Sequence, residues 1–480
     1  MIGIARKGWR YLAASVLLLV PCFWQPRLQA GDLSSHIYNA WLVQLIESGR
    51  TSGLAVARQS TNILFDLMLS GLLRTLGAEA AQRVAVSVAV LTFVWGVFVF
   101  VAVVSGRRPW GLMPAVAMLA YGWVFHSGFF NFYLSFGLCC WALALAWEPR
   151  PRRVLAAIPI LVLAYLAHAL PVLWTVGLAS YLALARRMAP RHPALLTAAA
   201  VLTMGGVHAL VSRSMFTRWS PTQVTFTTGL DQLWVFDTKY YVVLMGLLAV
   251  WGLLFLGLVR SQGARRVASG LPFQLCVISA SAVLVLPGAV LVPGYSQALS
   301  YIAERMSLGV AICICALLGA VRFNKLERVA LYAVALTYFF FLYSDERALN
   351  RFEDQMQDVV AALEPGQRVV SAIGDPHMRV NALTHVIDRV CLGRCYSYAN
   401  YEPSTRQFRV RALRPNPVVT SSRLEAWYLQ SGTYVVKPGD LPMYQVSVDH
   451  QGRIVLRELK AGTETGTTDM RLLPDWLGQG

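Results

Sequence analysis

The chain has 480 residues, of which 56% are hydrophobic and only 14% are charged. Soluble domains usually carry about 25% charged residues, which argues against a water-soluble globule of this length. The net charge of +17 does not indicate a nucleic-acid partner. The excess of Lys and Arg lies entirely within residues 1–344, between apolar runs, whereas residues 345–480 hold 16 basic and 16 acidic residues.

Apolar runs recur along residues 1–344, and many have the roughly 18 to 25 residues that span a bilayer. Clusters of Lys and Arg separate these runs, as they do in the cytoplasmic loops of membrane proteins. The alternation predicts a multi-pass protein of the cell inner membrane with a cytoplasmic N-terminus. We predict a mainly α fold, a polytopic bundle of about 11 transmembrane helices, at about 11–27, 82–104, 110–125, 130–147, two within 154–185, 194–212, 240–259, 271–292, 305–321 and 329–344.

The first apolar run has the pattern of a signal peptide. Arg6, Lys7 and Arg10 precede an apolar stretch from Tyr11 to about Trp24. However, cleavage after Ala30 would put Leu28 at the −3 position, where a small residue is required. We therefore interpret the run as an uncleaved first helix.

The run Val154–Ala185 has 32 residues, which is too long for one ordinary span and short for two. The next basic cluster, at 186–191, should lie inside like the one before it. The run must then cross the membrane twice, with an outer turn marked by His168 and Pro171. A single span would invert every later loop against the charge rule.

Residues 345–480 predict a soluble extracytoplasmic, or periplasmic, α/β domain, separate from the transmembrane part at 1–344. Cys391 and Cys395 lie in this tail. Zinc would need two further ligands, and the tail offers no second pair. A disulfide suits an oxidising compartment. We predict a helix over 346–363 and strands over 369–373, 408–411, 433–436 and 444–448.

The segment that follows the first helix carries the most informative polar residues. Gly31 and Asp32 are typical of a helix start, with Asp32 as a candidate N-cap. His36 would lie one turn later, close to the same face. This spacing allows either a capping Asp with an interfacial His, or an acid and an imidazole that meet at the outer membrane surface.

This layout resembles the GT-C superfamily of polyprenyl-phosphate-dependent glycosyltransferases. A first helix, an outer loop with an early Asp and an amphipathic helix are similar to that family, as are the odd number of spans and the outer C-terminal domain. The resemblance implies that Asp32 is the catalytic base. The loop lacks the Asp-x-Asp pair that some members use for a metal, so no cofactor is assigned and a divalent metal is left open.

Further candidates for substrate binding map near the outer face. His126 and Asn131 lie among aromatic residues at one predicted turn, where an interfacial aromatic belt is the alternative interpretation. His168 lies at the next turn. Glu304 and Arg305 open a helix, and Arg305 suits a phosphate because a guanidinium pairs with it in bidentate fashion. Snorkelling of Arg305 to the headgroups is the alternative.

The predicted function is transfer of a sugar from a polyprenyl-phosphate donor in the lipid bilayer to an extracytoplasmic glycan, lipid or protein acceptor. A carboxylate such as Asp32 would take the proton of the acceptor hydroxyl. The alternative is a transporter or flippase of a lipid-linked glycan or small solute, although the helices carry few charges at mid-membrane. A third interpretation is an assembly or scaffold protein in which the tail is the working part.

Overall fold

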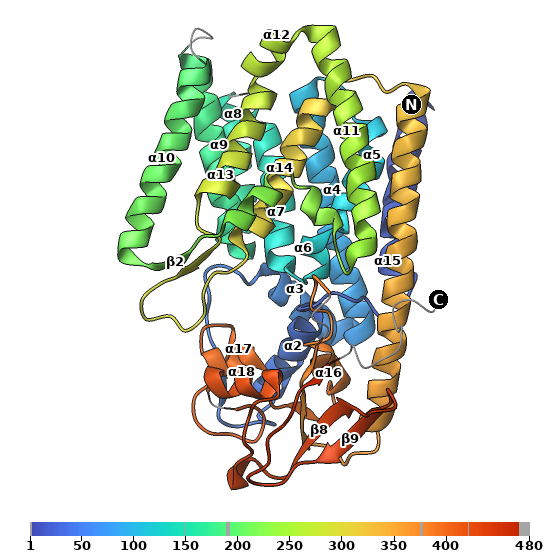
Figure 1. The fold of residues 1–480 in the computed structure, drawn as a ribbon, viewed down its shortest axis with the longest axis vertical. Coiled ribbons are helices and arrows are strands. Elements are labelled where there is room, and N and C mark those ends of the chain that lie inside the picture. The colour runs from blue at the N-terminus through green and yellow to red at the C-terminus, as the bar shows by residue number, and fades with distance from the viewer. Residues whose placement is uncertain (1, 149, 189–192, 375–377, 421, 470–480) are drawn as a thin grey trace. The chain divides into compact units, whose positions relative to one another are not determined.

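The computed structural model describes residues 2–148, 150–188, 193–374, 378–420 and 422–469. The structure is mainly helical, with 65% helix and 8% strand. The chain forms two units by contact (Figure 1). Unit 1 comprises 1–19, 87–125 and 130–341, and unit 2 comprises 20–86, 126–129 and 342–480. Unit 2 thus contains the segment that follows the first helix as well as the predicted tail.

Unit 1 is built from helices, with one pair of short antiparallel strands, β2 and β3. Helices α4, α6 and α15 have residues in both units. The elements are α1 (Ile2–Leu19), α4 (Ala78–Ser105), η2 (Trp110–Leu112), α5 (Met113–Ala120), α6 (Trp123–His126), α7 (Phe130–Ala146), α8 (Pro151–Ala167), α9 (Ala169–Arg187), α10 (Pro193–Ser214), β2 (Phe216–Arg218), η3 (Pro221–Phe226), η4 (Leu230–Leu233), η5 (Thr238–Tyr240), α11 (Tyr241–Gln262), α12 (Ala264–Ser269), α13 (Leu271–Val285), β3 (Ala289–Leu291), α14 (Ile302–Leu318) and α15 (Lys325–Val360).

Five helices among the described residues are long and apolar enough to cross a membrane. They are 78–105, 169–187, 194–214, 238–262 and 325–360. Shorter apolar helices lie at 8–22, 130–146 and 271–285. A span needs about 20 residues if the helix is untilted. The coarse prediction of a mainly helical chain is therefore confirmed, and several of its helices have the length and composition of membrane spans.

Local sequence sets several helix ends. His168 is extended between α8 and α9, and its Nδ1 accepts a hydrogen bond from the Leu170 N–H at 3.1 Å, which caps α9. The predicted interruption of this long run is therefore present. The helix predicted over 271–292 ends earlier, at Val285. Leu286 is extended because it precedes Pro287, a position that disfavours helix.

Two other predicted boundaries were also wrong. The first helix ends at Leu19 rather than near residue 27, and a short 3₁₀ turn containing Pro21 follows it. Proline lacks the N–H that a continuing helix requires. At the other end of the membrane part, the predicted last span and the predicted first helix of the tail are one continuous helix, α15.

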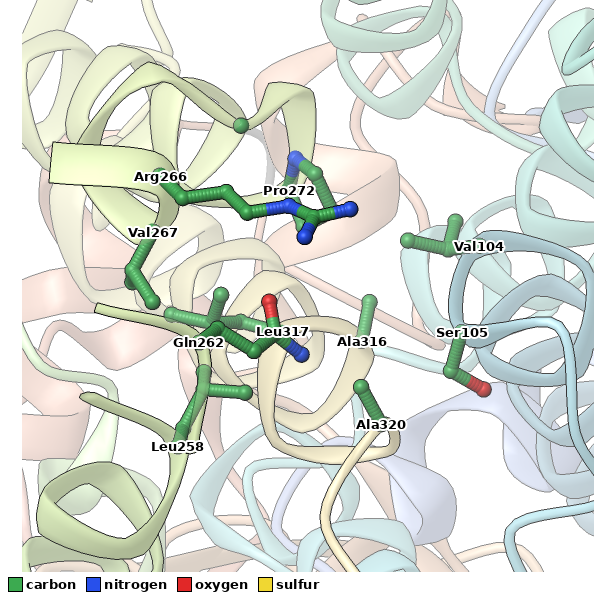
Figure 2. A pocket seen from close by; sticks show the side chains of 11 residues that line it. Val104, Ser105, Leu258, Gln262, Arg266, Val267, Pro272, Ala316, Leu317 and Ala320 are labelled. Atoms are coloured by element: carbon green, nitrogen blue, oxygen red, sulfur yellow. The ribbon is translucent and has the colours of Figure 1, made fainter. Parts of the chain in front are cut away.

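One end of unit 1 contains a pocket of about 190 Å³ (Figure 2). The C-terminal ends of α4, α11 and α14 meet there with α12 and the start of α13. Nη1 of Arg107, just after α4, donates to the carbonyl oxygen of Ala320, just after α14, at 3.1 Å. Figure 1 shows α12 at this end of unit 1 and β2 at the opposite end.

Unit 2 combines short helices with a small four-stranded sheet of order β6-β4-β8-β9. β4 runs parallel to β6 and β8, and β8 pairs antiparallel with β9. The elements are η1 (Val20–Cys22), α2 (Leu33–Glu47), β1 (Leu54–Val56), α3 (Leu64–Leu76), β4 (Arg368–Ser371), β5 (Ile373–Gly374), α16 (Val386–Val390), β6 (Tyr396–Ser397), α17 (Tyr401–Thr405), β7 (Val410–Ala412), α18 (Arg423–Ser431), η6 (Pro438–Asp440), β8 (Met443–Val448), β9 (Ile454–Glu458) and β10 (Thr468–Asp469).

The strands of unit 2 join segments far apart in the sequence. β1 pairs antiparallel with β7, so that Ala55 faces Arg411 across the ladder. The predicted strands over 369–373 and 444–448 largely match β4 and β8. The strand predicted over 433–436 is not a strand, because only Val435 forms a bridge, to Glu464.

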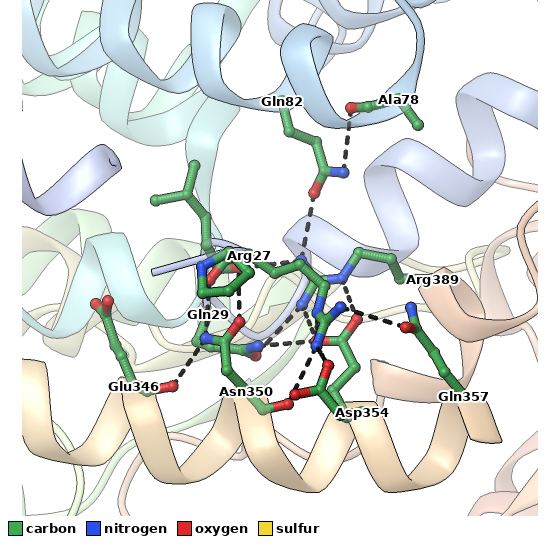
Figure 3. Close-up of polar contacts among 12 residues, drawn as sticks. Arg27, Gln29, Ala78, Gln82, Glu346, Asn350, Asp354, Gln357 and Arg389 are labelled. Carbon is green, nitrogen blue, oxygen red and sulfur yellow. Dashed lines mark hydrogen bonds and ion pairs between the residues drawn. The ribbon is translucent and has the colours of Figure 1, made fainter. Parts of the chain in front are cut away.

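A buried ionic network connects α15, α16 and the segment after η1 (Figure 3). Arg389 on α16 donates to both carboxylate oxygens of Glu353 on α15, at 2.7 and 2.5 Å. Gln29 donates to the same carboxylate at 2.8 Å, and Arg389 donates to the Leu28 carbonyl at 2.8 Å. The Glu353 side chain is fully buried. The desolvation of a buried ion pair is costly unless its hydrogen-bonding groups are satisfied. Movement of α16 would break these hydrogen bonds, so the network fixes its position.

Candidate functional site

Asp32 lies immediately before α2, where two backbone hydrogen bonds hold the chain. The Gly31 N–H donates to the His126 carbonyl at 2.7 Å, and the Asp32 N–H donates to the Ser127 carbonyl at 3.1 Å. A Cβ on Gly128 would lie 2.3 Å from the Asp32 nitrogen, so only glycine permits this approach. The Asp32 side chain makes no capping hydrogen bond to α2. Its carboxylate is therefore not occupied by a cap.

The imidazole of His385 lies close to the Asp32 carboxylate. Its Nε2 lies 3.7 Å from Asp32 Oδ1, and its Nδ1 lies 3.1 Å from Asp388 Oδ2. The Ser397 hydroxyl donates to the other oxygen of Asp388. Asp388 is nearly buried, with a side-chain exposure of 3%, whereas the Asp32 side chain is 27% exposed. The imidazole thus joins a buried carboxylate to one that reaches solvent.

A second acid–histidine pair lies one helical turn along α2. His36 Nδ1 is 2.6 Å from Asp66 Oδ1, in the first turn of α3. The His36 N–H donates to the Asp32 carbonyl at 2.9 Å, so Asp32 and His36 share a turn, as the spacing predicted. Arg409 donates to the Ser70 hydroxyl at 2.6 Å and to the Asp66 carbonyl at 3.3 Å. These contacts fix the Asp66 end of the pair.

The short helix α17 completes the cluster with Tyr401 and Glu402. Asn400 caps this helix by accepting from the Glu402 N–H, and its side chain donates to Asn39 on α2 at 2.9 Å. The Tyr401 ring centre lies 5.3 Å from that of His385. Glu402 is buried with 8% exposure, yet its charge acts on both His36 and His385.

The pKa shifts follow from burial and the crowding of charges. Burial lowers the pKa of His36, but Asp66 outweighs it and, with Glu402 and Asp32, raises the value to about 9. Burial also lowers the pKa of His385, but the neighbouring Asp388 and Asp32 raise it above its ordinary value. Burial, with the charges of Asp66 and Asp32, raises the pKa of Glu402 against the opposing effect of the two histidines. The cluster therefore favours protonated imidazoles beside an exposed carboxylate.

His126 also belongs to unit 2, where it contacts neighbouring backbone and side-chain groups. Its Nδ1 lies 3.1 Å from the Gln29 carbonyl, and its Nε2 lies 3.8 Å from a carboxylate oxygen of Glu346. The other oxygen of Glu346 accepts from the Trp24 indole at 2.5 Å. His126 is fully buried. These contacts are those of a residue that holds its loop in place.

The other predicted site residues belong to unit 1. Asn131 is buried in the first turn of α7. His168 caps α9, and its carbonyl accepts from Ser135 at 2.8 Å. Glu304 and Arg305 lie in the first turn of α14, and the charge of Arg305 acts on His168. The structure thus associates His168 with Arg305 within unit 1.

Cys391 and Cys395 form a disulfide directly after α16, with their Cα atoms 4.5 Å apart. Both cysteines are fully buried. The bond closes the turn that follows the helix carrying Asp388 and Arg389.

Reasoning from the sequence did not find His385, Asp388, Tyr401, Glu402 and Asp66. A weak signal existed in His385 and Asp388, because their spacing of three places both on one face of a helix. Nothing local could connect them to Asp32, more than 350 residues earlier. Among the described residues, no group of three or more His, Cys, Asp or Glu side chains is arranged to hold a metal ion. We therefore derive no step through a metal.

Comparison with known proteins gave no match to a family model, to a curated protein or to a solved structure. The function must therefore be argued from the residues of the site.

Proposed function

We propose that the chain is a membrane glycosyltransferase of the GT-C type, with Asp32 as general base. One observation carries the proposal: the Asp32 carboxylate is partly exposed, does not cap its helix and lies beside His385. The more deeply buried Asp388 and the His36-paired Asp66 are engaged by neighbours. Perturbed acid–imidazole clusters of this kind are typical of functional sites.

The proposed step transfers a sugar from a polyprenyl-phosphate donor to an extracytoplasmic acceptor hydroxyl. Asp32 takes the hydroxyl proton as the acceptor oxygen bonds to the anomeric carbon of the sugar. The bond from that carbon to the phosphate oxygen breaks, and its electron pair leaves with the polyprenyl phosphate. His385 would orient the Asp32 carboxylate through its Nε2, while its Nδ1 contacts Asp388. Cationic groups would favour the developing phosphate charge, and we propose Arg305 of unit 1 as a candidate residue for binding a lipid phosphate.

The topology is part of the same proposal. The chain would cross the cell inner membrane about 11 times, with a cytoplasmic N-terminus and a periplasmic tail at 345–480. The support is the distribution of basic loops between apolar runs. Single cysteines at Ser269 and Gly439, both exposed, should react with impermeant reagents from opposite sides of the membrane. Reaction of both from one side would contradict the layout.

The decisive experiment measures sugar transfer from lipid-phosphate donors by the purified chain in detergent. Asp32→Asn preserves the size of the side chain, and Asp32 makes no cap that the change could remove. Loss of a general base should lower the rate by about 10²–10⁴-fold. Asp358→Asn, at an exposed position of α15, is the matched control and should leave transfer unchanged.

Near-normal transfer by Asp32→Asn would show that the base lies elsewhere. The behaviour of the unmodified chain distinguishes the transferase from the alternative, a transporter. If the unmodified chain transfers no sugar from any donor but moves a lipid-linked glycan across liposomes, the chain is a transporter.

A further inference from the structure

A pocket lies at one end of unit 1, and its lining residues include none of the residues of the acid–histidine cluster. It has a volume of about 190 Å³ and lies where helix ends converge (Figure 2). Its lining residues are Val104, Ser105, Leu258, Gln262, Arg266, Val267, Gly270, Pro272, Ala316, Leu317 and Ala320.

Charge around this pocket has a single sign. Arg266 is the charged residue of the lining, and its side chain extends across the pocket beside Pro272 in Figure 2. The three chain segments that build the pocket, 104–108, 258–272 and 316–325, contain seven Lys and Arg residues and no Asp or Glu. The basic residues are Arg107, Arg108, Arg260, Arg265, Arg266, Arg322 and Lys325. The segments that form the pocket are therefore basic, and Arg266 is the basic residue that lines it.

Much of the pocket lining is apolar. Leu258, Val267 and Leu317 form a buried cluster against which Phe255 and Phe273 pack. Ser105 and Gln262 add polar side chains to the lining. The site thus offers a guanidinium, neutral polar groups and an apolar wall. This combination suits an amphiphile with a charged head and a carbon skeleton.

The size of the pocket restricts the ligand further. Pockets for whole drug-sized ligands occupy about 300–1,000 Å³, so this pocket takes one group of a larger molecule. A guanidinium binds phosphate by two parallel hydrogen bonds. Basic pockets between membrane helices are also a recognised place for anionic lipid headgroups.

We propose that this pocket binds the phosphate headgroup of an anionic phospholipid, with Arg266 as its main ligand. The glycerol portion would lie against Leu258, Val267 and Leu317. The inference is independent of the glycosyltransferase proposal, because it rests on unit 1 alone.

The test counts phosphatidylglycerol molecules bound to the purified full-length chain, by native mass spectrometry against a phosphatidylcholine background. The unmodified chain should retain phosphatidylglycerol, and Arg266→Gln should weaken its binding about tenfold or more, as expected for loss of a charge-assisted hydrogen bond. Arg265→Gln removes the same charge from the neighbouring exposed position outside the lining, and should retain binding.

A second variant tests the cavity without changing charge. Ala320→Leu adds bulk to the lining and should weaken phosphatidylglycerol binding while Arg266 remains. Equal binding by the unmodified chain and Arg266→Gln would overturn the proposal, as would equal losses in Arg266→Gln and Arg265→Gln. If inorganic phosphate alone competes fully at equal concentration, the site takes free anions and the lipid assignment is wrong.

Discussion

The predicted polar site residues are clustered in unit 2 and dispersed in unit 1. In unit 2, Asp32, His36, Asp66 and His385 lie within one cluster, and each charge has a partner of opposite sign. In unit 1, candidates such as Asn131 are dispersed among apolar helices. His168 is largely occupied by its own helix cap.

The difference matters because burial of a charge is unfavourable unless that charge is paired. A scattered polar residue at a helix end needs only local hydrogen bonds, and the cap formed by His168 is an example. A cluster of several buried carboxylates and imidazoles exceeds what packing requires. We therefore propose that the reactive groups belong to the cluster of unit 2. Substitutions of the residues that support this cluster should change stability, and substitutions within it should change the pH dependence.

The largest expected effect concerns the structural support. Arg389→Ala leaves the fully buried Glu353 carboxylate without its bidentate partner. Arg27 Nε remains 3.3 Å from the same carboxylate, so the free energy of unfolding should fall by about 3 kcal/mol, the lower end of the cost of removing one partner from a buried ion pair. Denaturant unfolding of the purified chain in detergent, followed by the exposure of a cysteine introduced in unit 2, measures the loss.

The control removes an arginine–carboxylate pair from the surface. Arg453 pairs with Asp449 at 2.8 Å, but its side chain is 69% exposed. Arg453→Ala should leave stability nearly unchanged, because exposed pairs contribute little. Similar losses in both variants would show that burial of the Arg389–Glu353 pair is not what stabilises unit 2.

The next effect concerns pH. The folded pKa of His36 is about 9, above its ordinary value of 6.5. A raised histidine pKa contributes stability that is complete below about pH 6.5 and is lost as the pH rises through 9. The shift corresponds to about 3 kcal/mol. The raised pKa of Glu402 acts in the same direction, because the folded state binds the additional proton.

Asp66→Asn identifies the source of this pH dependence. The change removes the main charge that raises the pKa of His36, so stability should vary less between pH 6 and pH 9.5 than in the unmodified chain. Glu79→Gln, which removes an exposed acid paired with Arg83 in the same unit, should preserve the original slope. Identical slopes in Asp66→Asn and the unmodified chain would contradict the assignment to His36.

The same comparison explains what could be predicted from sequence. Local patterns predicted the apolar helices, the interruption at His168 and the shared turn of Asp32 and His36, because each depends on neighbours a few residues apart. Predictions of helix ends were wrong where a single proline terminates the helix, as at Pro287. His385 and Glu402 were missed because tertiary folding, rather than spacing, brings the tail to the segment that follows η1.

The smallest effect tests the dispersed residues of unit 1. Arg305→Ala should raise the KM for the lipid-phosphate donor about tenfold, since one charge-assisted hydrogen bond is lost, with kcat changed less. Folding should persist, because Arg305 lies in the first turn of α14 and is only half-buried. Arg213→Ala, at the exposed end of α10, is the matched control for an arginine that snorkels to the headgroups. A KM rise confined to Arg305→Ala would assign unit 1 a specific role in donor binding. Equal KM values in the two variants would reduce Arg305 to an interfacial cation and leave donor recognition to other residues.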